Sequence, residues 1–175
     1  MKYGFDDFKP WVSSLALLPI MIYYSLNQGQ FTFIDYVNLL MHEGGHGIFK
    51  IFGKFIYTLG GTLAQILIPG MFVVYYGNNR KKVMTQIFLI WLGENLMNIS
   101  VYAADARAQQ LPLLGGNRVY HDWTYLLTQT NLLEYDKTVG QIFYWLGVVM
   151  FLVAFLMPLF LKQYKEAKID LELLK

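Results

Sequence analysis

The chain has 175 residues, of which 55% are hydrophobic and only 15% are charged. Soluble domains carry about 25% charged residues, so this composition excludes a water-facing globule and indicates a membrane protein. The net charge of +2 excludes the basic surface of a nucleic-acid-binding protein. The absence of cysteine excludes a disulfide scaffold, a thiolate metal site and a cysteine nucleophile. We expect one membrane-embedded domain over residues 1–175.

Five apolar segments predict an all-α fold, a multi-pass transmembrane bundle of about five hydrophobic helices. In chain order they are residues 11–26, 31–52, 55–79, 83–104 and 138–161. The first, third and fifth contain no Asp, Glu, Lys, Arg or His. A helix needs about 20 residues to cross the hydrocarbon core of a bilayer, and these runs are near that length. We expect residues 111–136 to form a connecting region at the membrane interface.

The second and fourth segments carry polar and charged residues, which are costly at membrane depth and commonly mark function. Asp35 lies where a carboxylate would favour the N-terminal end of a helix. Glu94, Asn95 and Asn98 occupy the fourth segment. We expect Asn95 to lie beside a functional site and Asn98 to hydrogen-bond between helices, as buried asparagines do in membrane bundles.

The strongest motif is His-Glu-Gly-Gly-His at residues 42–46. On a helix, His42 and His46 leave the same face one turn apart and can bind one metal ion. Glu43 points to the side, close enough to accept a proton from a metal-activated water without being a ligand. The pattern therefore predicts a Zn²⁺ site with Glu43 as general base. The glycines at 44, 45 and 47 leave room for a neighbouring helix or a substrate strand.

A His-Glu-x-x-His helix within an apolar chain resembles the site-2 protease family of intramembrane zinc metalloproteases. The resemblance spans roughly residues 36–128 and includes the glycine-rich stretch Leu-Gly-Gly-Thr-Leu-Ala-Gln at 59–65. It implies a multi-helix membrane enzyme that cuts substrates within or near the bilayer. It also implies that His42 and His46 are zinc ligands and that Glu43 is the general base.

The third zinc ligand has three candidates. The family supplies an aspartate after a segment with proline, and the nearest counterpart here, after Pro112, is Asp122. The residues themselves offer His121, because a histidine is an equally good zinc ligand and Asp122 could then orient it. Asp105 is the third candidate, and its alternative role is an ion pair with Arg107.

These features together predict a zinc-dependent membrane metalloprotease acting on a membrane-protein or peptide substrate. The expected location is a lipid bilayer, a bacterial inner membrane in the simplest case. Two alternative functions would use the same metal motif. One is a metal-dependent membrane hydrolase of a lipid or another non-peptide amide, and the other is a non-enzymatic metal-binding membrane scaffold.

Overall fold

The computed structural model describes residues 8–112 and 120–161, and every regular element within these ranges is a helix. The expected all-α class is therefore confirmed. The first half contains η1 (Lys9–Trp11), α2 (Val12–Leu26), α3 (Phe33–Phe49), η2 (Lys50–Phe52) and α4 (Lys54–Asn78). The second half contains α5 (Lys82–Ala104), α6 (Asp122–Gln129), η4 (Leu133–Tyr135) and α7 (Asp136–Phe160).

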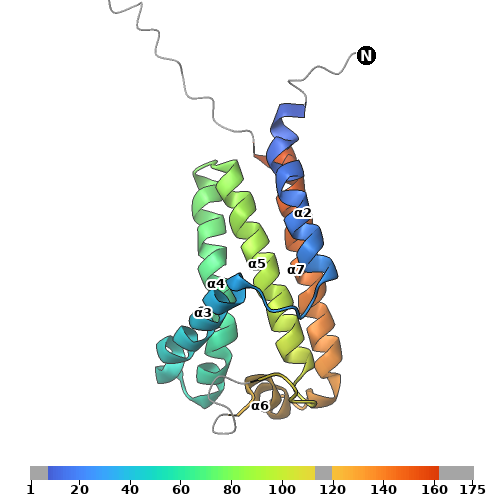
Figure 1. The fold of residues 1–175 in the computed structure, drawn as a ribbon. Coiled ribbons are helices and arrows are strands. Elements are labelled where there is room, and N and C mark those ends of the chain that lie inside the picture. Colours follow the sequence, from blue (N-terminus) through green and yellow to red (C-terminus); the bar gives the residue numbers. More distant parts are fainter. Residues whose placement is uncertain (1–7, 113–119, 162–175) are drawn as a thin grey trace, which may run out of the picture.

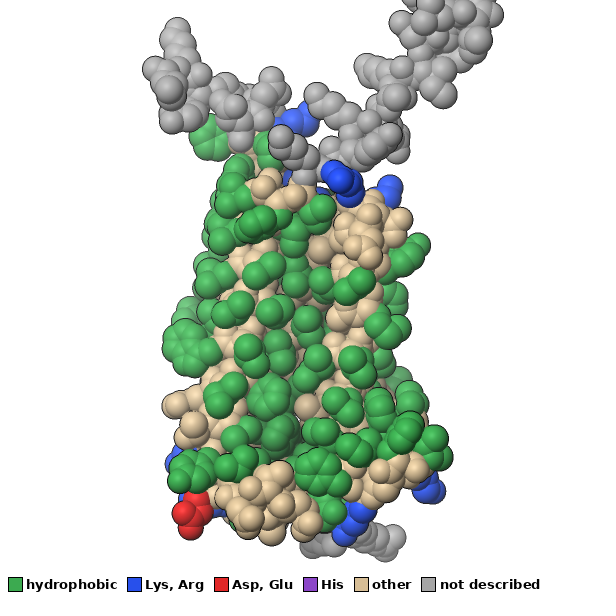
Figure 2. Space-filling view, turned by 180° about the vertical axis from the view of Figure 1, so that it is seen from behind, with side chains coloured by type: hydrophobic (Ala, Val, Ile, Leu, Met, Phe, Trp, Pro, Cys, Tyr) green, Lys and Arg blue, Asp and Glu red, His purple; other side chains and the backbone are tan. Residues whose placement is uncertain are grey.

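Three helical stretches in the described ranges are long and apolar enough to cross a membrane: α4, α5 and the continuous stretch Leu133–Phe160. The other two segments expected to cross are shorter, since α2 has 15 residues and α3 has 17. Hydrophobic side chains cover the length of one face, and Lys and Arg gather at its two ends (Figure 2). This distribution is typical of proteins whose helices cross a membrane.

Helix α5 lies at the centre of the bundle, between α4 on one side and α7 on the other (Figure 1). Its apolar side chains Leu89, Ile90 and Met97 pack against Phe151 and Met157 of α7 in a buried cluster. Because α5 contacts helices on more than one side, its buried residues do not follow a single stripe. This burial explains how polar residues of α5 come to lie inside the protein.

The start of α3 is fixed by a capping box between Thr32 and Asp35. The Asp35 carboxylate accepts hydrogen bonds at Oδ2 from the Thr32 backbone N–H at 2.6 Å and from the Thr32 hydroxyl at 2.8 Å. The expected place of Asp35 at a helix N-terminus is therefore confirmed. The capping box sets where the helix begins, and with it the positions of the motif residues 42–46.

Helix α3 lies obliquely against α4 (Figure 1), and the motif glycines explain the close approach. A Cβ added at Gly45 would lie 2.2 Å from the carbonyl oxygen of Gly60 in α4. Nothing lies within 4 Å of a Cβ added at Gly44 or Gly47. Of the three glycines expected to leave room beside the site, Gly45 is therefore the one that admits a neighbouring helix.

The expected connecting region 111–136 contains short elements. Helix α6 begins at Asp122 and lies at one end of the bundle, beside the C-terminal end of α5 (Figure 1). Residues 113–119, within that region, lie outside the described residues. Leu126 and Leu127 of α6 pack with Ile99 and Ala103 of α5 in a second buried cluster, which fixes α6 against α5.

Candidate metal centre

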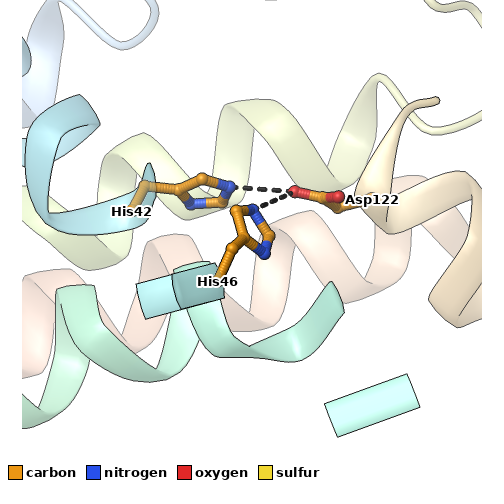
Figure 3. Close-up of side chains that lie close together, drawn as sticks. All are labelled: His42, His46 and Asp122. Carbon is orange, nitrogen blue, oxygen red and sulfur yellow. Dashed lines mark hydrogen bonds and ion pairs between the residues drawn. The ribbon is translucent and has the colours of Figure 1, made fainter. Parts of the chain in front are cut away.

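Three side chains from two helices meet at one point (Figure 3). Nε2 of His42 lies 2.9 Å from Oδ2 of Asp122, and Nε2 of His46 lies 3.1 Å from the same oxygen. All three side chains are largely buried, and their ligand atoms lie within 4.8 Å of one another. Within the described residues 8–112 and 120–161, no other group of three or more His, Asp or Glu side chains lies close enough together to share a metal ion.

Each imidazole ring is held through Nδ1, the ring nitrogen that does not face Asp122. Nδ1 of His46 lies 2.8 Å from the backbone carbonyl oxygen of Tyr57, and Nδ1 of His42 lies 2.9 Å from Oε1 of Gln65. Because these oxygens can only accept, each Nδ1 must carry the proton and donate it. Each neutral ring then presents the lone pair of its Nε2 toward Asp122, which is the arrangement found in metal-binding histidines.

This donor set fits a divalent cation. Two nitrogen lone pairs face one carboxylate oxygen at hydrogen-bonding distance, so a proton or a cation must lie between these electron-rich atoms. One cation serves all three atoms at once. Two imidazoles and a carboxylate are the protein ligands of a common class of catalytic zinc sites, which keep a further position open. His42, His46 and Asp122 are therefore suited to hold zinc.

Asp122 is positioned by the start of α6 and by α5. It is the first residue of α6, and its backbone N–H donates to the hydroxyl of Tyr102 in α5 at 3.2 Å. Burial alone would raise the pKa of the Asp122 carboxyl, but its close contacts with the His42 and His46 imidazoles outweigh burial and lower that pKa below its ordinary value. The carboxylate is thus in the charged form that a metal ion requires.

His121, the neighbouring candidate, points elsewhere. It is the N-cap residue of α6, and its Nδ1 accepts the backbone N–H of Thr124 at 3.3 Å. Its Nε2 lies 3.5 Å from Oδ2 of Asp105. The imidazole therefore links α6 to the end of α5 and lies outside the group formed by His42, His46 and Asp122.

Asp105 is also placed away from the cluster. Its carboxylate accepts the backbone N–H groups of Gln110 at 2.9 Å and Leu111 at 3.0 Å. The alternative ion pair between Asp105 and Arg107 was wrong, because Arg107 pairs instead with Asp136 of α7 at 2.7 Å. The carboxylate thus stabilises the turn after α5.

A cavity of about 380 Å³ opens onto the three clustered side chains. Glu43, whose side chain is exposed, lines this cavity together with His42, His46 and Asp122. Its walls include apolar side chains from several elements, among them Leu39 of α3. An exposed carboxylate in the same cavity as the three clustered side chains has the placement of a general base.

Of the two asparagines of α5, Asn98 hydrogen-bonds to the neighbouring helices α3 and α4 as expected, whereas Asn95 does not lie beside the site. Asn98 lines the cavity and accepts a hydrogen bond from Gln65 at 3.0 Å. Asn95 is fully buried and donates to the backbone carbonyl of Trp91 at 2.9 Å. It is not among the described residues that line the cavity. Glu94 lines the cavity and accepts from Asn38 at 2.7 Å. Sequence reasoning gave Gln65 no role, although it belongs to the glycine-rich stretch 59–65.

Helix α4 leaves space for the His42 ring at Gly61. A Cβ added there would lie 2.5 Å from both Cε1 and Nε2 of His42. We expect Gly61→Ala to displace the ring and weaken zinc binding by about 10- to 100-fold, as changes beside metal ligands commonly do. The measurement is the zinc dissociation constant of detergent-purified protein, determined by competition with a chelator.

Gly70 provides the matched control in the same helix, because a Cβ added there meets nothing within 4 Å. Both alanines favour helix formation, by up to about 1 kcal/mol. Gly70→Ala should therefore retain wild-type zinc affinity. Equal zinc affinities for the two variants would mean that contact with Gly61 does not position the His42 ring.

No protein-family model, curated protein or solved structure matches this chain. The resemblance to the site-2 protease family stays a prediction from the motif, and the functional case depends on the geometry of the cluster.

Proposed function

We propose that this protein is a zinc-dependent membrane metalloprotease that hydrolyses a peptide bond at or near membrane depth. The observation that carries the proposal is the meeting of His42, His46 and Asp122 at one point of a cavity that Glu43 also lines. The residues come from the motif predicted to bind zinc and from a helix distant in sequence. The spacing of His42 and His46 in the motif and the approach of Asp122 to both rings support one metal centre independently.

In this proposal each residue has a distinct part. His42, His46 and Asp122 would hold the metal, and Tyr57 and Gln65 keep the two imidazoles oriented. A bound zinc ion supplies Lewis-acid chemistry and lowers the pKa of water. Glu43 accepts the proton of the attacking water and passes it to the leaving amine, which is general base and then general acid catalysis.

The membrane placement is part of the same proposal. Helices α4, α5 and α7 would cross the bilayer, with α2 and α3 completing a five-helix bundle around the site. A bacterial inner membrane is the proposed location. The cavity wall carries Leu39, Met97 and Val101, which suit an apolar segment of a membrane protein better than a charged, water-soluble peptide.

The experiment uses detergent-purified protein with two kinds of substrate, a set of peptides from membrane-protein segments and a lipid extract. The expected result is peptide fragments that disappear when a chelator removes the metal and return when zinc is added. The apolar cavity wall also suits an acyl chain, which favours a lipid amide as the second candidate substrate. Hydrolysis of lipid with no peptide fragments would support that second function and contradict the first.

A further inference from the structure

A chain of hydrogen bonds connects the start of α3 to the metal-binding ring of His42. Oδ1 of Asp35 accepts from Nδ2 of Asn98 at 2.8 Å, and Oδ1 of Asn98 accepts from Nε2 of Gln65 at 3.0 Å. Oε1 of Gln65 then lies 2.9 Å from Nδ1 of His42. The chain passes from α3 to α5, then to α4, and returns to α3 about 10 Å further along the helix, since each residue rises 1.5 Å.

The direction of these hydrogen bonds is set at the Asp35 end. The Asp35 carboxylate can only accept, and its other oxygen already accepts from the N–H and hydroxyl of Thr32. Asn98 must therefore turn its NH₂ toward Asp35 and its oxygen toward Gln65. Gln65 must then turn its NH₂ toward Asn98 and its oxygen toward His42. The only partner left for Nδ1 of His42 is an acceptor.

We propose that Asp35, Asn98 and Gln65 are positioning residues that fix the tautomer of His42, so that its Nε2 lone pair is free for the metal. The inference rests on the proposed metal site but not on peptide hydrolysis. Of the four residues, Asp35, Gln65 and His42 are at least 93% buried, with exposed fractions of 5%, 2% and 7%.

Asp35→Asn tests the direction of the chain from a distance. The backbone N–H of Thr32 still needs an acceptor, so the new amide would turn its oxygen to Thr32 and its NH₂ to Asn98. Asn98 and Gln65 would both reverse, and Gln65 would present its NH₂ to Nδ1 of His42. That nitrogen would then accept, which moves the ring proton to Nε2. We expect zinc affinity to fall by about 10- to 100-fold, the usual effect of altering a residue behind a metal ligand.

The double variant Asp35→Asn/Gln65→Glu is designed to restore the tautomer. A glutamate at position 65 accepts at both oxygens, so it can take the NH₂ of the reversed Asn98 and also the Nδ1–H of His42. The two changes leave the net charge unchanged. Both variants carry the Asp35→Asn change, so any general effect of losing the Asp35 carboxylate near Glu94 is common to them.

The measurement is the zinc dissociation constant of the wild type and both variants by chelator competition, with Tm recorded for each. We expect weaker zinc binding in Asp35→Asn and recovery toward the wild-type value in the double variant. Equal affinity in Asp35→Asn and wild type, or a double variant no better than the single one, would overturn the proposed role. If the wild type binds no zinc, the metal site and this inference fall together. If it binds zinc but cleaves no peptide, only the protease proposal fails.

Discussion

Replacing Glu43 by glutamine is expected to reduce peptide hydrolysis by about 10²- to 10⁴-fold, the usual contribution of a general base. Glutamine has nearly the same shape but cannot take a proton from water. Glu43 lines the cavity beside His42, His46 and Asp122 without belonging to that cluster, so bound zinc should remain at the wild-type level. The measurements are the rate of fragment formation by mass spectrometry and the zinc content of the same samples.

Glu134→Gln is the matched control, because it makes the same chemical change at an exposed position of η4 that is not among the residues lining the cavity. Its activity should equal that of the wild type. Unchanged activity in Glu43→Gln would remove Glu43 from the chemistry. If the wild type shows no hydrolysis and Glu43→Gln leaves its physiological role intact, the metal-binding scaffold becomes the better description.

The long helices could be predicted closely because the absence of charge marks their limits. The charge-free run at 55–79 corresponds to α4 at Lys54–Asn78, and the run at 138–161 corresponds to α7 at Asp136–Phe160. The number of helices long enough to cross could not be predicted in this way. The run at 11–26 corresponds to α2 at Val12–Leu26, whose 15 residues fall short of the about 20 that a helix needs to cross the hydrocarbon core.

Within the site, the sequence predicted what lies on one helix and left open what tertiary structure supplies. His42 and His46 share a face because of their spacing alone. Asp122 is 80 residues from His42 in sequence, so only packing of α6 against α5 can bring it there. His121 and Asp122 are adjacent, and their positions at the start of α6 determine which of the two side chains reaches the cluster. The imidazole at the N-cap turns to the Thr124 N–H, while the next side chain points to the cluster.

Position around the helix explains why Asn98 lines the cavity and Asn95 does not. Asn98 follows Glu94 by four residues, so the two share a face, and that face lines the cavity. Asn95 lies about 100° around the helix from Glu94 and is packed inside the bundle. The spacing of Glu94 and Asn98 was visible in the sequence. Because α5 is buried on several sides, hydropathy gave no sign of which face meets the site.

Removing one of the proposed zinc ligands is the second change with a large expected effect. His46→Ala and Asp122→Ala should each remove most of the zinc from a protein that otherwise binds it stoichiometrically. Each deletes one of three converging ligand atoms, and catalytic zinc sites usually have three protein ligands. The measurement is zinc per chain in detergent-purified protein after dialysis against metal-free buffer.

His121→Asn separates the two adjacent candidates for the third ligand. Asparagine is a favourable N-cap residue, so it can replace the imidazole in accepting the Thr124 N–H while removing the candidate zinc ligand. If Asp122 is the ligand, His121→Asn keeps its zinc and Asp122→Ala loses it. Zinc loss in His121→Asn, at a wild-type Tm, would instead make His121 the ligand and Asp122 the residue that orients it. The cluster geometry favours the first result, because Oδ2 of Asp122 is the atom that both motif histidines face.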